Sequence, residues 1–123
     1  MVLSSFLLAQ AGGWVFIDPR SQGQVAGNRM GWRVQVGAFI HKRNAERLAA
    51  KLHRQIDQPI YIVVEPPWHK VLVGDFVKKE DAEKYLEVIR SLGYADAFVK
   101  ESPVNAQNDD SLQGGSQGQD QGN

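Results

Sequence analysis

The side chains with the most suggestive chemistry lie in two short segments in which every second residue is valine. In residues 33–36 the valines alternate with Arg33 and Gln35, and in residues 70–73 they alternate with Lys70 and Leu72. Guanidinium, ammonium and amide groups bind polar ligands through hydrogen bonds, and aromatic rings supply flat apolar surfaces. These are means of noncovalent recognition, and the candidate binding residues are Arg33, Gln35, Tyr61, Trp68, Lys70 and Leu72.

Catalytic chemistry is not indicated. His41, His53 and His69 lack the spacing of metal sites such as H-E-x-x-H, and the chain has no cysteine. Glu80 and Asp81 are adjacent in the chain, so they cannot face each other across a substrate. No G-x-S-x-G, P-loop or G-x-G-x-x-G motif is present. We therefore expect a protein that is not an enzyme and uses neither a metal nor another cofactor.

Length and charge limit the class of protein further. The chain has 123 residues, 42% of them hydrophobic, with 14 Lys and Arg against 14 Asp and Glu, which predicts one small globular domain with polar appendages. The formal neutrality argues against a dedicated nucleic-acid binder. No apolar run approaches the roughly 18 to 20 residues that cross a bilayer, so we expect no transmembrane span.

The segments that position the candidate residues belong to an internal repeat of 37 residues, in which residues 32–52 align with residues 69–89. Each copy begins with an alternating strand pattern, continues through a glycine and an aromatic residue, and ends in an amphipathic helical pattern. The identical pairs are Val34 and Val71, Val36 and Val73, Gly37 and Gly74, Phe39 and Phe76, Lys42 and Lys79, Ala45 and Ala82, and Glu46 and Glu83.

Each predicted helix leads into a further strand, over residues 60–64 in the first copy and 97–100 in the second. The element order is therefore β-α-β-β-α-β. Because β-α-β crossovers are right-handed, this order predicts an α+β domain of the split β-α-β (ferredoxin-like) type. Its expected architecture is a four-stranded antiparallel sheet with both helices on one face.

Alternation along the strands assigns each side chain to one face of this sheet. The four valines of the repeat are expected under the helices, so Arg33, Gln35, Lys70 and Leu72 turn to the open face. Trp68 has the same parity as Lys70. Tyr61 and Phe98 occupy equivalent positions of the two copies, and we expect both on the open face as well.

The sequence resembles the SPOR (sporulation-related repeat) domain family. The resemblance rests on Trp32-Arg33-Val34-Gln35-Val36-Gly37-Ala38-Phe39, on the second half-repeat from Trp68 to Phe76, and on the helix openings Asn44-Ala45-Glu46 and Asp81-Ala82-Glu83. It covers about residues 32–101. At position 75, where the family often has proline, this chain has Asp75.

The resemblance implies a peptidoglycan-binding module that recognises glycan strands lacking stem peptides on its open sheet face. In the family this face carries a Gln and a Trp that match Gln35 and Trp68. The implied protein is exported to the bacterial envelope, where it is periplasmic and gathers at the septum beside cell-division or cell-wall enzymes. The residues suit a sugar, whose C–H faces stack on aromatic rings. The lactyl carboxylate that stem-peptide removal exposes would pair with Arg33 or Lys70.

Structural roles are the alternative for each of these side chains. The polar members are also compatible with simple solvation. Trp68 follows Pro66-Pro67 at the start of a strand, where it could cover the end of a core. Tyr61 and Phe98 could be packing residues, particularly if residues 14–17 fold over them.

Two other binding functions suit the same architecture. RNA-recognition domains stack bases on this sheet face, but their RNP1 pattern is missing from residues 70–73. A module that docks another protein through the sheet face or an outer strand is the more serious alternative.

The two ends of the chain differ from this domain. Residues 1–31 comprise an apolar start, which is either an export signal remnant or an extension of the domain, a possible short strand at residues 14–17, and a linker. Residues 102–123 contain three aspartates and no Lys, Arg or aromatic residue. We expect this acidic tail to be disordered.

Overall fold

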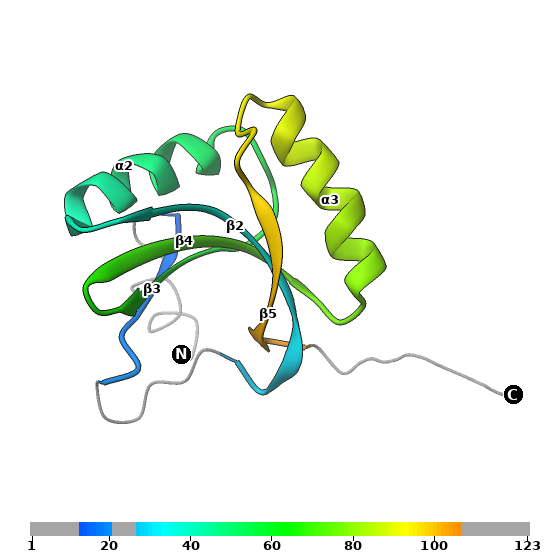
Figure 1. Cartoon of the computed structure of the whole chain (residues 1–123), viewed down its shortest axis with the longest axis horizontal. Coiled ribbons are helices and arrows are strands. Elements are labelled where there is room, and N and C mark those ends of the chain that lie inside the picture. Colours follow the sequence, from blue (N-terminus) through cyan, green and yellow to red (C-terminus); the bar gives the residue numbers. More distant parts are fainter. Residues whose placement is uncertain (1–12, 21–26, 107–123) are drawn as a thin grey trace, which may run out of the picture.

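The computed structural model describes residues 13–20 and 27–106 of the chain. Within these ranges the chain forms two helices and five strands, and both helices lie on the same side of a curved sheet (Figure 1). The elements are β1 (Val15–Ile17), β2 (Arg29–Phe39), α2 (Lys42–His53), β3 (Ile60–Glu65), β4 (Trp68–Phe76), α3 (Lys79–Ser91) and β5 (Phe98–Val104).

The sheet has five strands in the order β1-β3-β4-β2-β5. From β2 onward the order of elements is the predicted β-α-β-β-α-β, and the four strands of this unit pair antiparallel. The prediction of a purely antiparallel four-stranded sheet was nevertheless wrong. The short strand β1 adds to the outer edge of β3 in parallel, so the complete sheet is mixed.

The core lies between the sheet and the helices, as the alternation of the valines predicts. Val34, Val71 and Val73 are completely buried and pack with Ala45, Ala49 and Leu52 of α2 and with Ile89 of α3. Val36 packs against the same cluster at its margin. Burial of aliphatic side chains is the main stabilising contribution to a domain of this size, at roughly 1.5 to 3 kcal/mol for each large one.

Strand β5 is longer than the pattern indicated, because Ser102, Pro103 and Val104 continue its pairing with the start of β2. Beyond the last pair, the Asn28 side chain accepts the backbone N–H of Ala106 at 3.1 Å and donates to its carbonyl at 3.3 Å. Residues 28 and 106 therefore lie side by side. The remainder of the acidic tail, from residue 107, lies outside the described residues, as do residues 1–12 and 21–26.

A bulge in β4 depends on Gly74, which has φ +90°. A Cβ atom at this position would clash with the ring of Phe76. A Cβ atom at Gly93, which has φ +107°, would have no neighbouring atom within 4 Å. We expect Gly93→Ala to lower the free energy of unfolding by about 1 kcal/mol, the backbone contribution alone, and Gly74→Ala by about 2 to 3 kcal/mol. Urea unfolding measures both, and equal losses would contradict the steric contribution.

Candidate functional site

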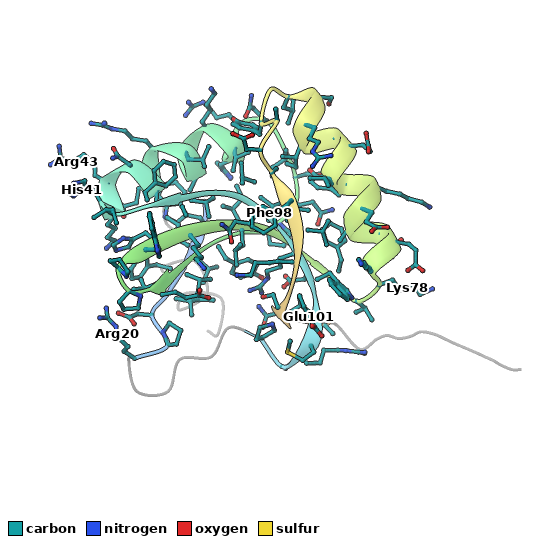
Figure 2. The ribbon with its side chains drawn as sticks, in the orientation of Figure 1. Arg20, His41, Arg43, Lys78, Phe98 and Glu101 are labelled. Carbon is teal, nitrogen blue, oxygen red and sulfur yellow. The ribbon has the colours of Figure 1, made fainter. Side chains whose placement is uncertain are left out.

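A continuous row of side chains crosses all five strands on the sheet face away from the helices. The strand register places Val15 opposite Tyr61, Tyr61 opposite Leu72, Leu72 opposite Gln35, and Gln35 opposite Phe98. Residues in register on neighbouring strands point to the same face. The structure thus brings together three of the predicted site residues, with Phe98 at one end of the row. Figure 2 shows Phe98 on β5.

The middle of this face is covered and its rim is exposed, which corrects the expectation of an open face. Tyr61 and Leu72 are buried in a second apolar cluster with Ile17 and Val63, against which Val15 packs. The rim aromatic residues keep large exposed fractions, 41% for Trp68 and 46% for Phe98. A ligand on this face would therefore meet the rim first.

Arg33 points to the predicted face, but the expectation that it is available to a ligand was wrong. Its side chain is fully buried, and its guanidinium donates to the Gly74 carbonyl at 3.0 Å and to the Asp75 carboxylate at 2.7 Å. The guanidinium carbon also lies 3.8 Å from the centre of the Tyr61 ring. These neighbours satisfy the charge internally, which alternation along a single strand could not indicate.

Asp75 connects Arg33 to two further groups. Its second carboxylate oxygen accepts the Tyr61 hydroxyl at 2.5 Å, and its first accepts the backbone N–H of Asn105 at 2.9 Å. The Asn105 side-chain amide in turn donates to the Tyr61 hydroxyl at 3.1 Å. Burial, and then the hydrogen bond to Asp75, raises the pKa of Tyr61 to about 12. The phenol therefore stays protonated at neutral pH, and the network joins β2, β3 and β4 to the chain after β5.

Gln35, at the centre of the row, is 91% buried, with 9% of its surface exposed. Its amide oxygen Oε1 is buried and has no hydrogen-bond partner among the described residues. A buried acceptor without a donor is costly, by about 1 to 3 kcal/mol, and is uncommon in folded proteins. Gln35 is therefore a buried polar residue of this face whose hydrogen bonding is incomplete.

Lys70 and Lys100 form the cationic part of the face. Lys70 donates to Glu65 at 2.6 Å, and this hydrogen bond lowers the pKa of the Glu65 carboxyl. Burial, with a further contribution from the charge of Lys70, lowers the pKa of the Lys100 ammonium, while Glu65 opposes this shift. Two ammonium groups thus share one carboxylate, so the cluster keeps an excess positive charge.

Trp68 begins β4 after the Pro66–Pro67 turn, whose peptide bond is cis, and it pairs with Glu65 across the β3–β4 hairpin. The ring belongs to neither apolar cluster and is therefore not a core residue. Lys70 follows two residues later, so the exposed indole and the lysine cluster lie at the same end of the hairpin.

Three contributors to this face were missing from the predicted set. Lys100 has the parity of Phe98, so strand alternation contained the signal for it. Asp75 was noted as a departure from the family's sequence, without a role. Asn105 lies in the segment that was predicted to be disordered, and nothing in its sequence context pointed to the Tyr61 hydroxyl.

Neither a metal site nor a membrane helix is found in residues 13–20 and 27–106. No group of three or more His, Cys, Asp or Glu residues lies close enough together to hold a metal ion in these ranges. Neither α2 nor α3 is long and apolar enough to cross a membrane.

The fold and this face define a class of protein, a split β-α-β domain that presents a sheet face with exposed aromatic and cationic groups at its rim. The sequence matches the SPOR domain family over residues 28–101, more than half of the chain, so the protein belongs to this family. No curated protein and no solved structure matched the chain. SPOR domains are peptidoglycan-binding modules linked to cell division, generally without catalytic activity, and the chain is accordingly a bacterial cell-wall-associated protein.

Proposed function

We propose that this protein binds peptidoglycan glycan strands that lack stem peptides, through the face that carries the Val15-to-Phe98 row, and that it thereby acts at the septum as an exported, periplasmic protein. The observation that carries the proposal is the composition of the face. Gln35 holds an unpartnered acceptor at its centre, and two exposed aromatic side chains lie at its rim. Sugar rings offer C–H surfaces for the aromatic rings and hydroxyl or acetamido donors for the amide oxygen.

The preference for stripped strands follows from the lysine cluster. Removal of a stem peptide from N-acetylmuramic acid leaves a free lactyl carboxylate. We assign this carboxylate to Lys70 and Lys100, because Glu65 is the carboxylate that faces these two positive charges among the described residues, and charge-assisted hydrogen bonds to carboxylates are strong. Arg33 is excluded from this role by its burial against Asp75. Unchanged affinity after neutralising both lysines would refute the assignment.

Cosedimentation of the full chain with peptidoglycan sacculi tests the proposal. We expect stronger binding to sacculi from which an amidase has removed the stem peptides than to untreated sacculi. Trp68→Ala should weaken binding to the treated sacculi about three- to tenfold, since a stacked aromatic ring contributes about 0.5 to 1.5 kcal/mol beyond its buried area.

Val88→Ala is the matched control, because Val88 is an exposed apolar residue of α3, which packs on the opposite side of the sheet from this face. It should bind as the unmodified chain does. Equal binding to both kinds of sacculi would refute the preference for stripped strands. Absence of binding to either would refute glycan recognition and favour a protein-docking module of the same fold.

A further inference from the structure

The outer surface of α2 carries a line of cations. Arg43, Arg47, Lys51 and Arg54 follow one another at intervals of four, four and three residues, which places them on one side of the helix, and all four are exposed. Within the described ranges of the chain none of them forms an ion pair, and Lys51 alone has an aromatic neighbour, the Tyr94 ring at 5.7 Å. The line extends for about 16 Å along the helix axis.

A hollow of about 450 Å³ lies at the start of this line. It is lined by His41, Lys42, Arg43, Asn44 and Arg47, without any carboxylate. The helix itself adds positive potential there, because its first turn contains no acidic residue and His41 makes no side-chain capping hydrogen bond. Figure 2 shows His41 and Arg43 at the outer edge of the molecule, beside the first turn of α2. The hollow and the line together form what we term the α2 cationic surface.

The second copy of the repeat provides a comparison within the same molecule. Arg43 corresponds to Glu80, Arg47 to Lys84, Lys51 to Val88 and Arg54 to Ser91, so these positions hold four cations in the first copy and one in the second. Helix α3 carries four acidic and three basic residues, whereas α2 carries one acidic and four basic residues. Since both helices pack on the same sheet in the same way, packing does not require the cations of α2.

The α2 cationic surface also lies on the opposite side of the domain from the proposed glycan face. Helix α2 packs with its buried residues Ala45, Ala49 and Leu52 on the sheet, so its cations point away from it. A ligand on this surface would not compete with a glycan on the other side of the sheet.

We propose that the α2 cationic surface binds a linear polyanion with repeating phosphodiester groups, of the kind found among cell-wall polymers. The hollow accepts one phosphate beside Arg43, Arg47 and the Asn44 amide, with Lys42, which also pairs with Glu46 at 3.9 Å, as a third cation. The regularly spaced line accepts the phosphates that follow. Guanidinium groups are suited to phosphate because they donate two parallel hydrogen bonds. The protein thus bridges two polymers, a glycan on its sheet and a phosphodiester polymer on α2.

A membrane surface is the less suitable partner. Stable attachment of a helix to a bilayer requires apolar or aromatic side chains beside the cations. Among the described residues near the α2 cationic surface, Ile40 is the one large apolar side chain that is substantially exposed. A row of charges without an apolar border fits a flexible polymer in water better than a lipid interface.

The test measures binding of the full chain to a synthetic poly(glycerol phosphate) at several salt concentrations. We expect Arg43→Gln combined with Arg47→Gln to weaken binding at least tenfold at low salt. It should also reduce the slope of log K against log salt concentration by about one for each arginine removed. Both residues are exposed, so the variant should retain the stability of the unmodified chain.

Lys78→Gln combined with Lys84→Gln removes the same charge from the residue before α3 and from its first half, where Lys84 is the repeat equivalent of Arg47, and both side chains are exposed. This control should bind the polymer as the unmodified chain does, and both variants should still bind amidase-treated sacculi. The proposal is overturned if the two variants lose equal affinity, if the unmodified chain does not bind the polymer, or if it binds anionic vesicles of phosphatidylglycerol better than the polymer. Each of these results is independent of whether the sheet face binds glycan.

Discussion

Replacing Arg33 by leucine should lower the free energy of unfolding by about 3 to 5 kcal/mol. Removal of one partner from a buried ion pair leaves the other charge without compensation, which is the costly case for such pairs. In this protein Asp75 would lose its contact at 2.7 Å, and the Tyr61 ring would lose the guanidinium stacked on it at 3.8 Å. Urea unfolding followed by tryptophan fluorescence measures the loss.

The exposed pair of Arg20 and Asp18 provides the matched control. Its atoms are as close, at 2.8 Å, but 64% of the Arg20 side chain is exposed. Exposed ion pairs contribute little to stability, so Arg20→Leu should leave the unfolding curve almost unchanged. Combining Arg33→Leu with Asp75→Asn should cost less than the two single losses together, because the double variant contains no uncompensated charge. A stable Arg33→Leu variant would contradict the structural role of the network.

Replacing Gln35 by leucine should change stability and binding in opposite directions. Leucine has a similar volume and removes the unpartnered Oε1 atom, so we expect the free energy of unfolding to stay constant or rise by up to about 1 to 2 kcal/mol. The same change removes an acceptor for a sugar donor, and affinity for amidase-treated sacculi should fall about 10- to 100-fold. Urea unfolding and cosedimentation of one preparation measure both quantities.

Gln55→Leu makes the same substitution on the other side of the molecule. Gln55 is exposed and accepts the Tyr94 hydroxyl at 2.6 Å, so its loss should reduce stability slightly without affecting glycan binding. A Gln35→Leu variant that gains stability and keeps full affinity would show that the orphaned oxygen has no role in recognition.

Much of the fold was predictable because the same strand and helix pattern occurs in both copies of the repeat. Two copies of an alternating segment followed by an amphipathic helix define four strands, two helices and their common core, and the buried valines agree with the prediction. Strand β1 was only a possible strand in the sequence. Its three residues are too few for a periodic signal, and its parallel pairing with β3 depends on contacts 46 residues apart.

The sequence predicted the sheet face to which the site side chains point better than it predicted whether they are exposed. Alternation places Gln35, Leu72 and Tyr61 on the face away from the helices, and the register agrees. Whether a side chain on that face is free depends on partners that are distant in sequence. Arg33 is buried because Asp75 lies 42 residues away along the chain and beside it in the sheet. A pattern read along one strand contains no information about such a partner.

The proximity of Asn28 and Ala106 has a mechanical consequence. Because β2 and β5 are antiparallel and residues 28 and 106 lie at the same end of this pair, tension applied directly through these two residues would peel the strands apart rather than slide them. The hydrogen bonds would break one after another, beginning at Arg29 and Val104. Gln35 and Phe98 form the pair farthest from residues 28 and 106, so peeling from these residues would advance toward the proposed glycan row and separate that pair last.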